Sequence, residues 1–375
     1  MWPLVFTVMA AAAPLTVVAG GATAGFAVTG LTGIPLGYLV VAAILALFSV
    51  GYVAMSRRVV NAGAFSTYVT RGLGKPAGVA AAFVAVLGYN TMQVGLYGGF
   101  GFVLADFAEA RIGLDLPWSV WALLACAAVA VLGGRRIDLN SRVLTVLLIA
   151  EIAVAVVFAV VQVAHPAGGT VSFTTLSPGN LFTGLAAAAA LATAIAGFVG
   201  FEGTAVFGEE TRDPRRTVAR ATYIALAVIG LLYAFCSWAM SVATGPEHIV
   251  ERATAESSEL IFNLAAPYLP SALLTLGHLL FITSLFAALL AFHNTCARYF
   301  FALGREGVLF AVLGRTSPNT HAPIVGSLLQ TGLLPAARRV VRGSAGWCGC
   351  LIRRVCRRWS RLSSRMSGTV LTWWA

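Results

Sequence analysis

The residues Ala-Gly-Phe-Val-Gly-Phe-Glu-Gly occupy positions 196–203 and interrupt an apolar run that extends over about residues 180–207. The three glycines favour local unwinding of a helix, because glycine has no side chain to restrict its backbone. Irregular backbone at membrane depth is tolerated only where it lines a cavity or is packed inside protein. This stretch therefore predicts a broken membrane helix, the sixth in the chain.

A second interruption lies in the first apolar run, where residues 10–21 read Ala-Ala-Ala-Ala-Pro-Leu-Thr-Val-Val-Ala-Gly-Gly. Pro14 removes a helical N–H and clashes with the preceding turn. Interrupted helices at matching positions of two halves indicate a transporter substrate site, and these two spans are five apart. The alternative is that Pro14 only kinks a helix and the glycines only permit close packing. The matched spacing favours the substrate site.

Composition places both interruptions in a membrane. The 375 residues are 59% hydrophobic and 10% charged, whereas an average globular domain has about 25% charged residues. These values exclude a soluble enzyme, a disordered chain and a disulfide scaffold. Long uncharged runs predict an all-α polytopic membrane protein. We expect about nine transmembrane helices, near residues 3–25, 33–55, 77–105, 118–134, 143–164, 180–207, 219–243, 270–297 and 322–335.

Arginine and lysine in the loops predict the orientation. One set of loops carries nearly all of the basic residues outside the C-terminal tail, and the alternate loops hold only Arg111 and Arg252, among acidic residues. This alternation places the N-terminus and the basic loops in the cytoplasm. The N-terminus has no charged region of the kind that opens a removed signal, so residues 3–25 are interpreted as a spanning helix.

Three stretches carry a family resemblance. Residues 198–220 read Phe-Val-Gly-Phe-Glu-Gly-Thr-Ala-Val-Phe-Gly-Glu-Glu-Thr-Arg-Asp-Pro-Arg-Arg-Thr-Val-Ala-Arg, an aromatic-x-Gly-aromatic-Glu core followed by Glu-Glu-x-x-x-Pro-x-Arg. This resembles the amino acid–polyamine–organocation (APC) permease superfamily. Residues 55–74 look like that family's loop after the second span, and residues 293–307 look like its exit from the eighth. The resemblance covers about residues 1–335 and defines the expected permease domain.

The resemblance implies a LeuT-like fold, in which two inverted five-helix repeats hold a substrate between unwound helices one and six. It implies a secondary transporter of amino acids, polyamines or related amines, coupled to protons or working by exchange, in the cytoplasmic membrane. Most members have twelve helices. The implied partners are a small-molecule substrate and the lipid bilayer, with no enzyme activity, cofactor, metal or nucleic acid; the sequence does not indicate the oligomeric state.

The candidate substrate-binding residues lie in the first, third and sixth spans. Helix N-termini and free N–H groups at the first break suit a substrate carboxylate, although Thr16 could instead bond within its own helix. Phe198 and Phe201 match the family's aromatic positions, and packing is their alternative role. Tyr89, Gln93 and Tyr97 share a helix face, as a lining or as contacts between helices. The predicted set is Ala13, Pro14, Leu15, Thr16, Gly20, Tyr89, Gln93, Gly197, Phe198, Gly200 and Phe201.

Two acidic residues lie inside predicted spans. An intramembrane carboxylate is costly and indicates function by default, so Glu202 is a candidate for proton coupling or gating; its alternative is a structural bond to the broken backbone. Glu151 is the second candidate, and its alternative is pairing with a loop arginine. No phosphate-binding loop, zinc-protease motif or nucleophile elbow occurs, and the five histidines lack metal spacing.

Residues 336–375 differ from the rest of the chain. They contain nine arginines, four of the eight tryptophans and three of the six cysteines, with no apolar run of spanning length. We interpret this tail as the product of a shifted reading frame; the alternatives are a basic amphipathic anchor on anionic lipid or, more weakly, a metal site at its cysteines. Because helices ten to twelve are not apparent, the alternative function is a non-transporting permease fragment or a membrane assembly partner.

Overall fold

The computed structural model describes residues 5, 9, 12–59, 64–134, 141–206, 214–315 and 323–332. The chain divides into two compact units, Met1–Ser327 and Leu328–Ala375. The second unit is described only at residues 328–332, which are helical, and the predicted tail at 336–375 lies outside the described residues. All regular structure in the described ranges is helical, as the sequence predicts for a polytopic membrane protein.

Five helices of the described part are long and apolar enough to cross a membrane. A helix rises 1.5 Å per residue, so about 20 residues cover the hydrocarbon core of a bilayer. The five helices are α4 (Ile34–Ser56), α6 (Lys75–Ile112), α8 (Ser141–Ala164), α11 (Pro214–Thr244) and α14 (Ser271–Arg305). The chain is therefore a multi-pass membrane protein, while the total of nine spans stays a prediction.

Shorter helical segments lie between the long helices. The first and sixth predicted spans are each divided, which is why neither yields one long helix. The remaining segments are α2 (Pro14–Thr16), η1 (Val17–Ala22), α3 (Thr23–Thr29), α5 (Ala64–Leu73), α7 (Trp118–Gly134), η2 (Ala167–Gly169), η3 (Thr174–Leu176), η4 (Pro178–Asn180), α9 (Ala186–Ala196), α10 (Gly203–Val206), α12 (Ile249–Glu256), η6 (Ser257–Glu259), α13 (Leu260–Ala265) and η7 (Ala311–Gly314), with a helix over 324–327.

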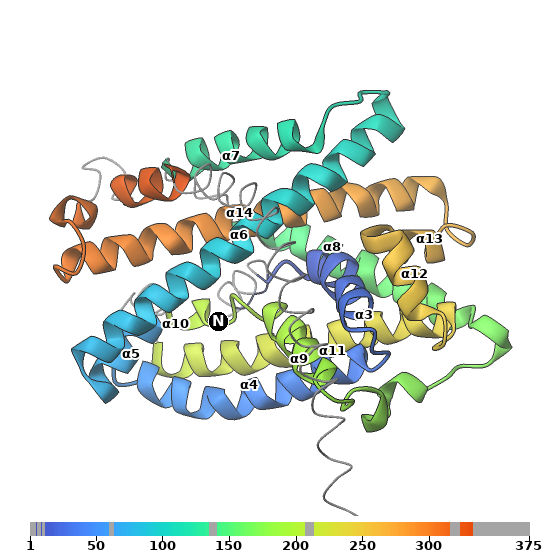
Figure 1. The fold of residues 1–375 in the computed structure, drawn as a ribbon, viewed down its shortest axis with the longest axis horizontal. Coiled ribbons are helices and arrows are strands. Elements are labelled where there is room, and N and C mark those ends of the chain that lie inside the picture. Colours follow the sequence, from blue (N-terminus) through green and yellow to red (C-terminus); the bar gives the residue numbers. More distant parts are fainter. Residues whose placement is uncertain are drawn as a thin grey trace, which may run out of the picture. The chain divides into compact units, whose positions relative to one another are not determined.

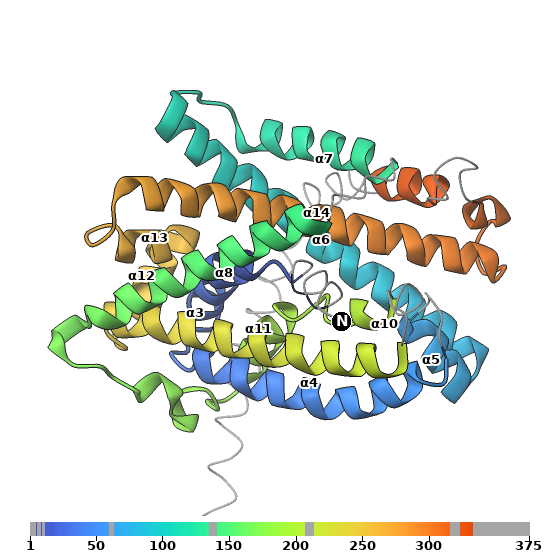
Figure 2. The same cartoon turned by 180° about the vertical axis from the view of Figure 1, so that it is seen from behind.

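Two pairs of long helices organise the first unit. Helices α4 and α11 lie side by side, and α6 packs against α14 (Figures 1 and 2). Helix α8 packs on both α11 and α14, so it joins the two pairs. The short helices of the first and sixth spans lie among these five helices, where the side chains from α4, α6, α8, α11 and α14 reach them.

Helix α5 corrects one expectation, because residues 64–73 were predicted as part of a loop. Tyr68 on α5 is buried against Tyr52 of α4, with ring centroids 5.5 Å apart. On the side of α6, a Cβ atom at Gly78 would overlap the Thr70 side chain, so the two helices approach closely. These contacts stabilise an amphipathic helix in a segment whose polar residues suggest a loop.

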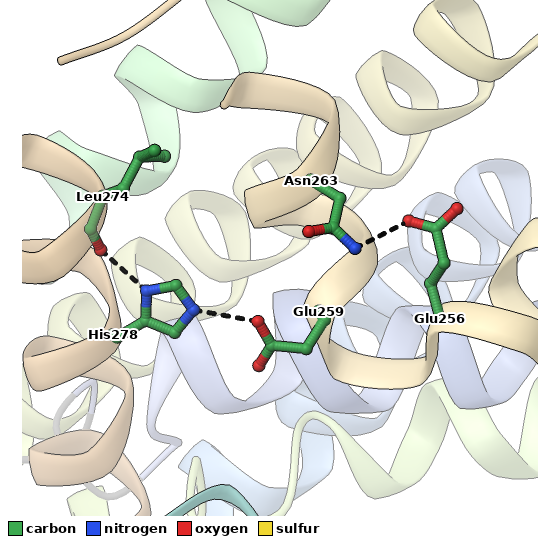
Figure 3. Close-up of polar contacts among 5 residues, drawn as sticks. All are labelled: Glu256, Glu259, Asn263, Leu274 and His278. Carbon is green, nitrogen blue, oxygen red and sulfur yellow. Dashed lines mark hydrogen bonds and ion pairs between the residues drawn. The ribbon is translucent and has the colours of Figure 1, made fainter. Parts of the chain in front are cut away.

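Polar contacts fix the segment between α11 and α14 (Figure 3). Glu256 accepts hydrogen bonds from Nε of Arg252 at 2.6 Å and from Nδ2 of Asn263 at 3.0 Å. Glu259 lies 2.9 Å from Nε2 of His278 on α14, and the His278 ring stacks on Phe262 with centroids 3.9 Å apart. The segment also packs against α3, so it covers one end of the first span.

Candidate functional site

The first span breaks at Ala13, as Pro14 predicts. Ala13 has φ 44° and ψ 70°, a left-handed conformation that is uncommon outside glycine. Pro14 then opens α2 as its first residue, where the missing N–H costs nothing. The chain continues as a π-helix over Val17–Ala22 before α3 begins. Short π-helical segments are rare and frequently occur at functional sites.

The sixth span is unwound between Ala196 and Gly203, where the glycine-rich stretch stands. Gly200 has φ +114°, a conformation that a side chain would strain. Gly197 has no room for a side chain, because a Cβ atom there would lie 2.8 Å from Cγ1 of Val17. The two interruptions therefore contact each other through Val17 and Gly197.

Glu202 lies at the end of the second interruption and is buried, with 6% of its surface exposed. Its Oε1 accepts a hydrogen bond from the Tyr89 hydroxyl, and its Oε2 accepts one of 2.9 Å from the Gly200 N–H. The Tyr52 hydroxyl donates to the Glu202 backbone carbonyl at 2.6 Å. Tyr299 of α14 packs on Tyr89, with centroids 5.8 Å apart. Helices α4, α6 and α14 thus each direct a tyrosine to this region.

Glu151 lies at the first interruption and not beside a loop arginine. It is 5% exposed, and its carboxylate accepts hydrogen bonds from the Ser284 hydroxyl and the Leu15 N–H. Thr16 lies in α2, and its hydroxyl donates to the Ser284 hydroxyl of α14 at 3.1 Å. Helices α8 and α14 therefore hold the broken end of the first span through one polar network.

The two predicted aromatic residues of the sixth span are buried in ring clusters. Phe198 is 1% exposed and packs on Tyr38 and Tyr233, with centroids 6.4 and 5.8 Å away. Phe201 packs on Phe48 and Tyr52 at 6.4 and 6.2 Å. These contacts correspond to the packing alternative.

The third-span residues divide between the two roles considered. Tyr89 joins Glu202, whereas Gln93 donates from Nε2 to the Leu289 carbonyl of α14 at 3.3 Å, a contact between helices. Tyr97 is buried on the same face. Gly20 of the π-helix accepts a 3.1 Å hydrogen bond from Thr23, and a Cβ atom there would meet no atom within 4 Å.

Sequence reasoning missed Ser284, Tyr52 and Tyr299. Ser284 stands beside Thr283 in the otherwise apolar middle of α14, and two adjacent hydroxyls are a weak signal without knowledge of their neighbours. Tyr52 and Tyr299 stand near the ends of their helices, where a tyrosine is commonly explained by the membrane interface. Within the described ranges, no group of three metal-ligating side chains comes together.

A comparison with protein families identifies the chain. The model described as "Amino acid permease" matches residues 3–334. The chain belongs to this family. The permease is 26% identical over 276 residues to an uncharacterized transporter of Mycobacterium tuberculosis, covering 69% of the chain and 60% of the relative. It is 21% identical over 310 residues to the low-affinity putrescine importer PlaP of Escherichia coli, covering 80% of the chain and 66% of PlaP.

A shorter match supports the same family. The permease is 31% identical over 140 residues to the vacuolar cationic amino acid transporter 4 of Arabidopsis thaliana, covering 37% of the chain and 22% of that protein. The chain spans about 60% of the length of the mycobacterial relative. The family match, together with relatives that are named as transporters, confirms the resemblance to the APC superfamily.

Proposed function

We propose that the permease is a secondary active transporter of amino acids or related amines across the cytoplasmic membrane, working by alternating access around its broken first and sixth spans. The observation that carries the proposal is the contact of the two breaks at Val17 and Gly197. Broken helices that meet inside the membrane are the arrangement in which transporters hold a substrate. The family match and the transporter relatives support the same conclusion.

The proposed architecture is a LeuT-like inverted repeat with a cytoplasmic N-terminus. Breaks in spans one and six, five apart, support two related halves. The concentration of arginine in alternate loops supports the orientation. In such an architecture, one half moves against the other around a fixed site.

The proposed coupling groups are Glu202 and Glu151. Each is buried, and each accepts hydrogen bonds from a broken helix. When such a carboxylate loses its charge or changes its partner, the free energy of the broken-helix conformation to which it is hydrogen-bonded changes as well. Proton binding at either residue therefore favours one arrangement of the broken helices over another.

Uptake into proteoliposomes tests the proposal. The purified chain is compared with Glu202→Gln and with Glu251→Gln, a matched change of an exposed glutamate on α12. A panel of labelled amino acids and polyamines is offered with and without a proton gradient. We expect gradient-driven uptake by the parent and by Glu251→Gln, and a loss of gradient-driven uptake in Glu202→Gln, because the neutral amide cannot bind and release a proton. No uptake by folded parent protein would assign the chain to the non-transporting alternative.

A further inference from the structure

A histidine that lies away from the two breaks is placed between two hydrogen-bond acceptors (Figure 3). Nδ1 of His278 on α14 is 2.9 Å from the Leu274 carbonyl, and Nε2 is 2.9 Å from Oε2 of Glu259 in η6. A neutral imidazole has one N–H, so it donates to only one of these acceptors, and its other nitrogen then presents a lone pair to an oxygen. The imidazolium has two N–H groups and satisfies both acceptors. The surroundings of His278 are therefore complementary to the charged ring.

An aromatic ring from α13 suits the same charged form. The His278 ring stacks on the buried ring of Phe262, with centroids 3.9 Å apart and an interplanar angle of 19°, and Phe107 of α6 lies 6.3 Å away. The face of an aromatic ring attracts a cation that lies within about 6 Å of its centroid. His278 thus contacts the segment between α11 and α14 twice, through Glu259 and through Phe262.

The other charged groups that act on this pair come from α6. The charge of Arg111 opposes a charge on the His278 ring, whereas Asp106 lies close enough to Glu259 for the two carboxylates to repel each other. Glu109 acts on Asp106 in the same way. A charged His278 offsets the repulsion among these carboxylates, because it is in direct contact with Glu259.

The pair is accessible to protons from water. His278 keeps 19% of its side chain exposed and Glu259 keeps 36%. Helix α14 has 35 residues, so it is about 52 Å long and extends beyond the roughly 30 Å hydrocarbon core of a bilayer. His278 lies in the first turns of α14, at the end of the helix opposite to Arg305. Under the proposed orientation, the solution outside the cell supplies the proton.

The segment that His278 contacts is sharply bent. Ser257, two residues before Glu259, has φ 51° and ψ −131° at the end of α12, a conformation that side chains rarely adopt. A strained backbone of this kind persists only where the surrounding contacts hold it. The 3₁₀ turn η6, which begins at this bend, packs against α3 and η1 of the broken first span. Loss of the contact with His278 therefore weakens the hold on a strained bend that covers the first span.

We propose that His278 is a proton-binding site separate from Glu202 and Glu151, and that its charged form holds η6 and α13 against α14 over the outer end of the first span. The ion pair is present where His278 is protonated and Glu259 is ionised. It is lost as the pH rises through about 6.5, the range in which histidine releases its proton. An acidic exterior thus keeps the cover of the first span in place, and a higher external pH loosens it.

Hydrogen–deuterium exchange of the purified full chain tests this inference without any measurement of transport. Backbone exchange over residues 257–265 is compared at about pH 5.5 and about pH 8, on either side of the ordinary value for histidine, with labelling times corrected for the intrinsic effect of pH. We expect about threefold faster exchange at the higher pH in the parent, as for a partly exposed ion pair. In His278→Gln and in Glu259→Gln, exchange should be as fast at both pH values as in the parent at the higher one, because neither variant retains an ion pair.

The matched control is His248→Gln, which removes an exposed histidine next to α12 and should keep the pH effect of the parent. Thermal melting checks that each variant is folded, and if one of the two variants of the pair does not fold, the other carries the test. Equal exchange at both pH values in the parent, or a pH effect that persists in the folded variants of the pair, overturns the inference. Loss of the effect in His248→Gln overturns it as well, because the proton is then bound elsewhere. All of these outcomes leave the transporter function standing, since uptake tests it separately.

Discussion

Thr16 and Ser284 form a hydrogen bond of 3.1 Å, although they are 268 positions apart in the chain. Ser284 also donates to Glu151, so one serine joins the broken first span to both α8 and α14. Because three segments meet at this hydroxyl, its loss affects all of them. The bond is a direct link between a helix break and the long helices that surround it.

The first prediction concerns this link. Thr16→Val keeps the side-chain shape and removes the hydroxyl, and Ser284→Ala removes its partner. Thr16→Val should lower the free energy of unfolding by about 1 kcal/mol, the net value of one buried hydrogen bond, and Ser284→Ala should lower it by more, because it also removes a donor to Glu151. The double variant should cost less than the sum of the two, because the same bond is lost only once. Chemical denaturation of the four proteins measures the coupling; strict additivity would show that the bond contributes nothing.

The second prediction concerns Tyr89. Tyr89→Phe leaves Oε1 of Glu202 without its donor, at a cost of about 1–3 kcal/mol for a buried acceptor. Gradient-driven uptake should fall, and its dependence on external pH should shift. The matched control is Thr91→Val on the exposed side of α6, where the hydroxyl bonds only to its own helix. Equal uptake profiles for both variants would contradict a role for the Tyr89–Glu202 pair.

The third prediction concerns the contact between the two breaks. Gly197→Ala places a methyl group against Val17 and should destabilise the permease by about 1–3 kcal/mol. Val17→Ala in the same chain should restore much of that loss, because it removes the obstructing methyl group. Gly95→Ala on α6 is the control, since its Cβ meets no atom within 4 Å and alanine favours a helix. Melting temperatures of the variants check this: Gly197→Ala should melt lowest, the double variant with Val17→Ala should melt higher, and Gly95→Ala should melt no lower than the parent.

The fourth prediction concerns acid stability outside the membrane. Burial raises the pKa of Glu256, but hydrogen bonds from Arg252 and Asn263 and the Arg252 charge outweigh it, so the pKa lies below its ordinary value of 4.5 (Figure 3). A lowered pKa in the folded state gives stability that is present above pH 4.5 and is lost as the pH falls through the lowered pKa.

Melting curves between pH 3 and pH 7, about the range that includes the ordinary pKa of a carboxylate, test the direction of this pKa shift. The advantage of the parent over Glu256→Gln should be constant near neutral pH and should disappear towards the acid end. Glu251→Gln, on the exposed face of the same helix, should follow the parent throughout. An advantage of the parent that grows on acidification would show that the folded-state pKa is raised.

The breaks could be predicted from the sequence because their causes are local. Pro14 cannot continue a helix from the preceding turn, and Gly200 adopts a conformation that side chains disfavour. The partners of the broken ends could not be predicted, because Ser284 and Tyr299 meet them only through packing of distant helices. Glu151 shows the limit most clearly: its position in an apolar run marks it as unusual, but only the fold brings it to Leu15.

Helix α5 was missed for a related reason. Its polar residues suggest a loop, and its apolar side becomes decisive only when Tyr68 lies against Tyr52 and α6 approaches closely. Phe198 and Phe201 lie in the unwound stretch of the predicted sixth span, and their ring neighbours come from α4 and α11. Patterns in a sequence therefore indicate where a helix is interrupted, whereas the contacts that the residues of the interruption make depend on the tertiary structure.

Tyr52 bonds to the backbone carbonyl of Glu202, while Tyr89 bonds to its carboxylate. A carbonyl cannot gain or lose a proton under these conditions, so the Tyr52 attachment persists whatever the charge of the side chain. The Tyr89 attachment, by contrast, is made to the group that changes charge, and it should weaken when the carboxylate is protonated, because hydrogen bonds to an ionised acceptor are stronger than those to a neutral one. The unwound segment is thus attached to α4 through a bond whose acceptor keeps its charge, and to α6 through a bond whose strength depends on the charge of Glu202. Any tilting of this segment on protonation should turn about Tyr52 and move it away from Tyr89.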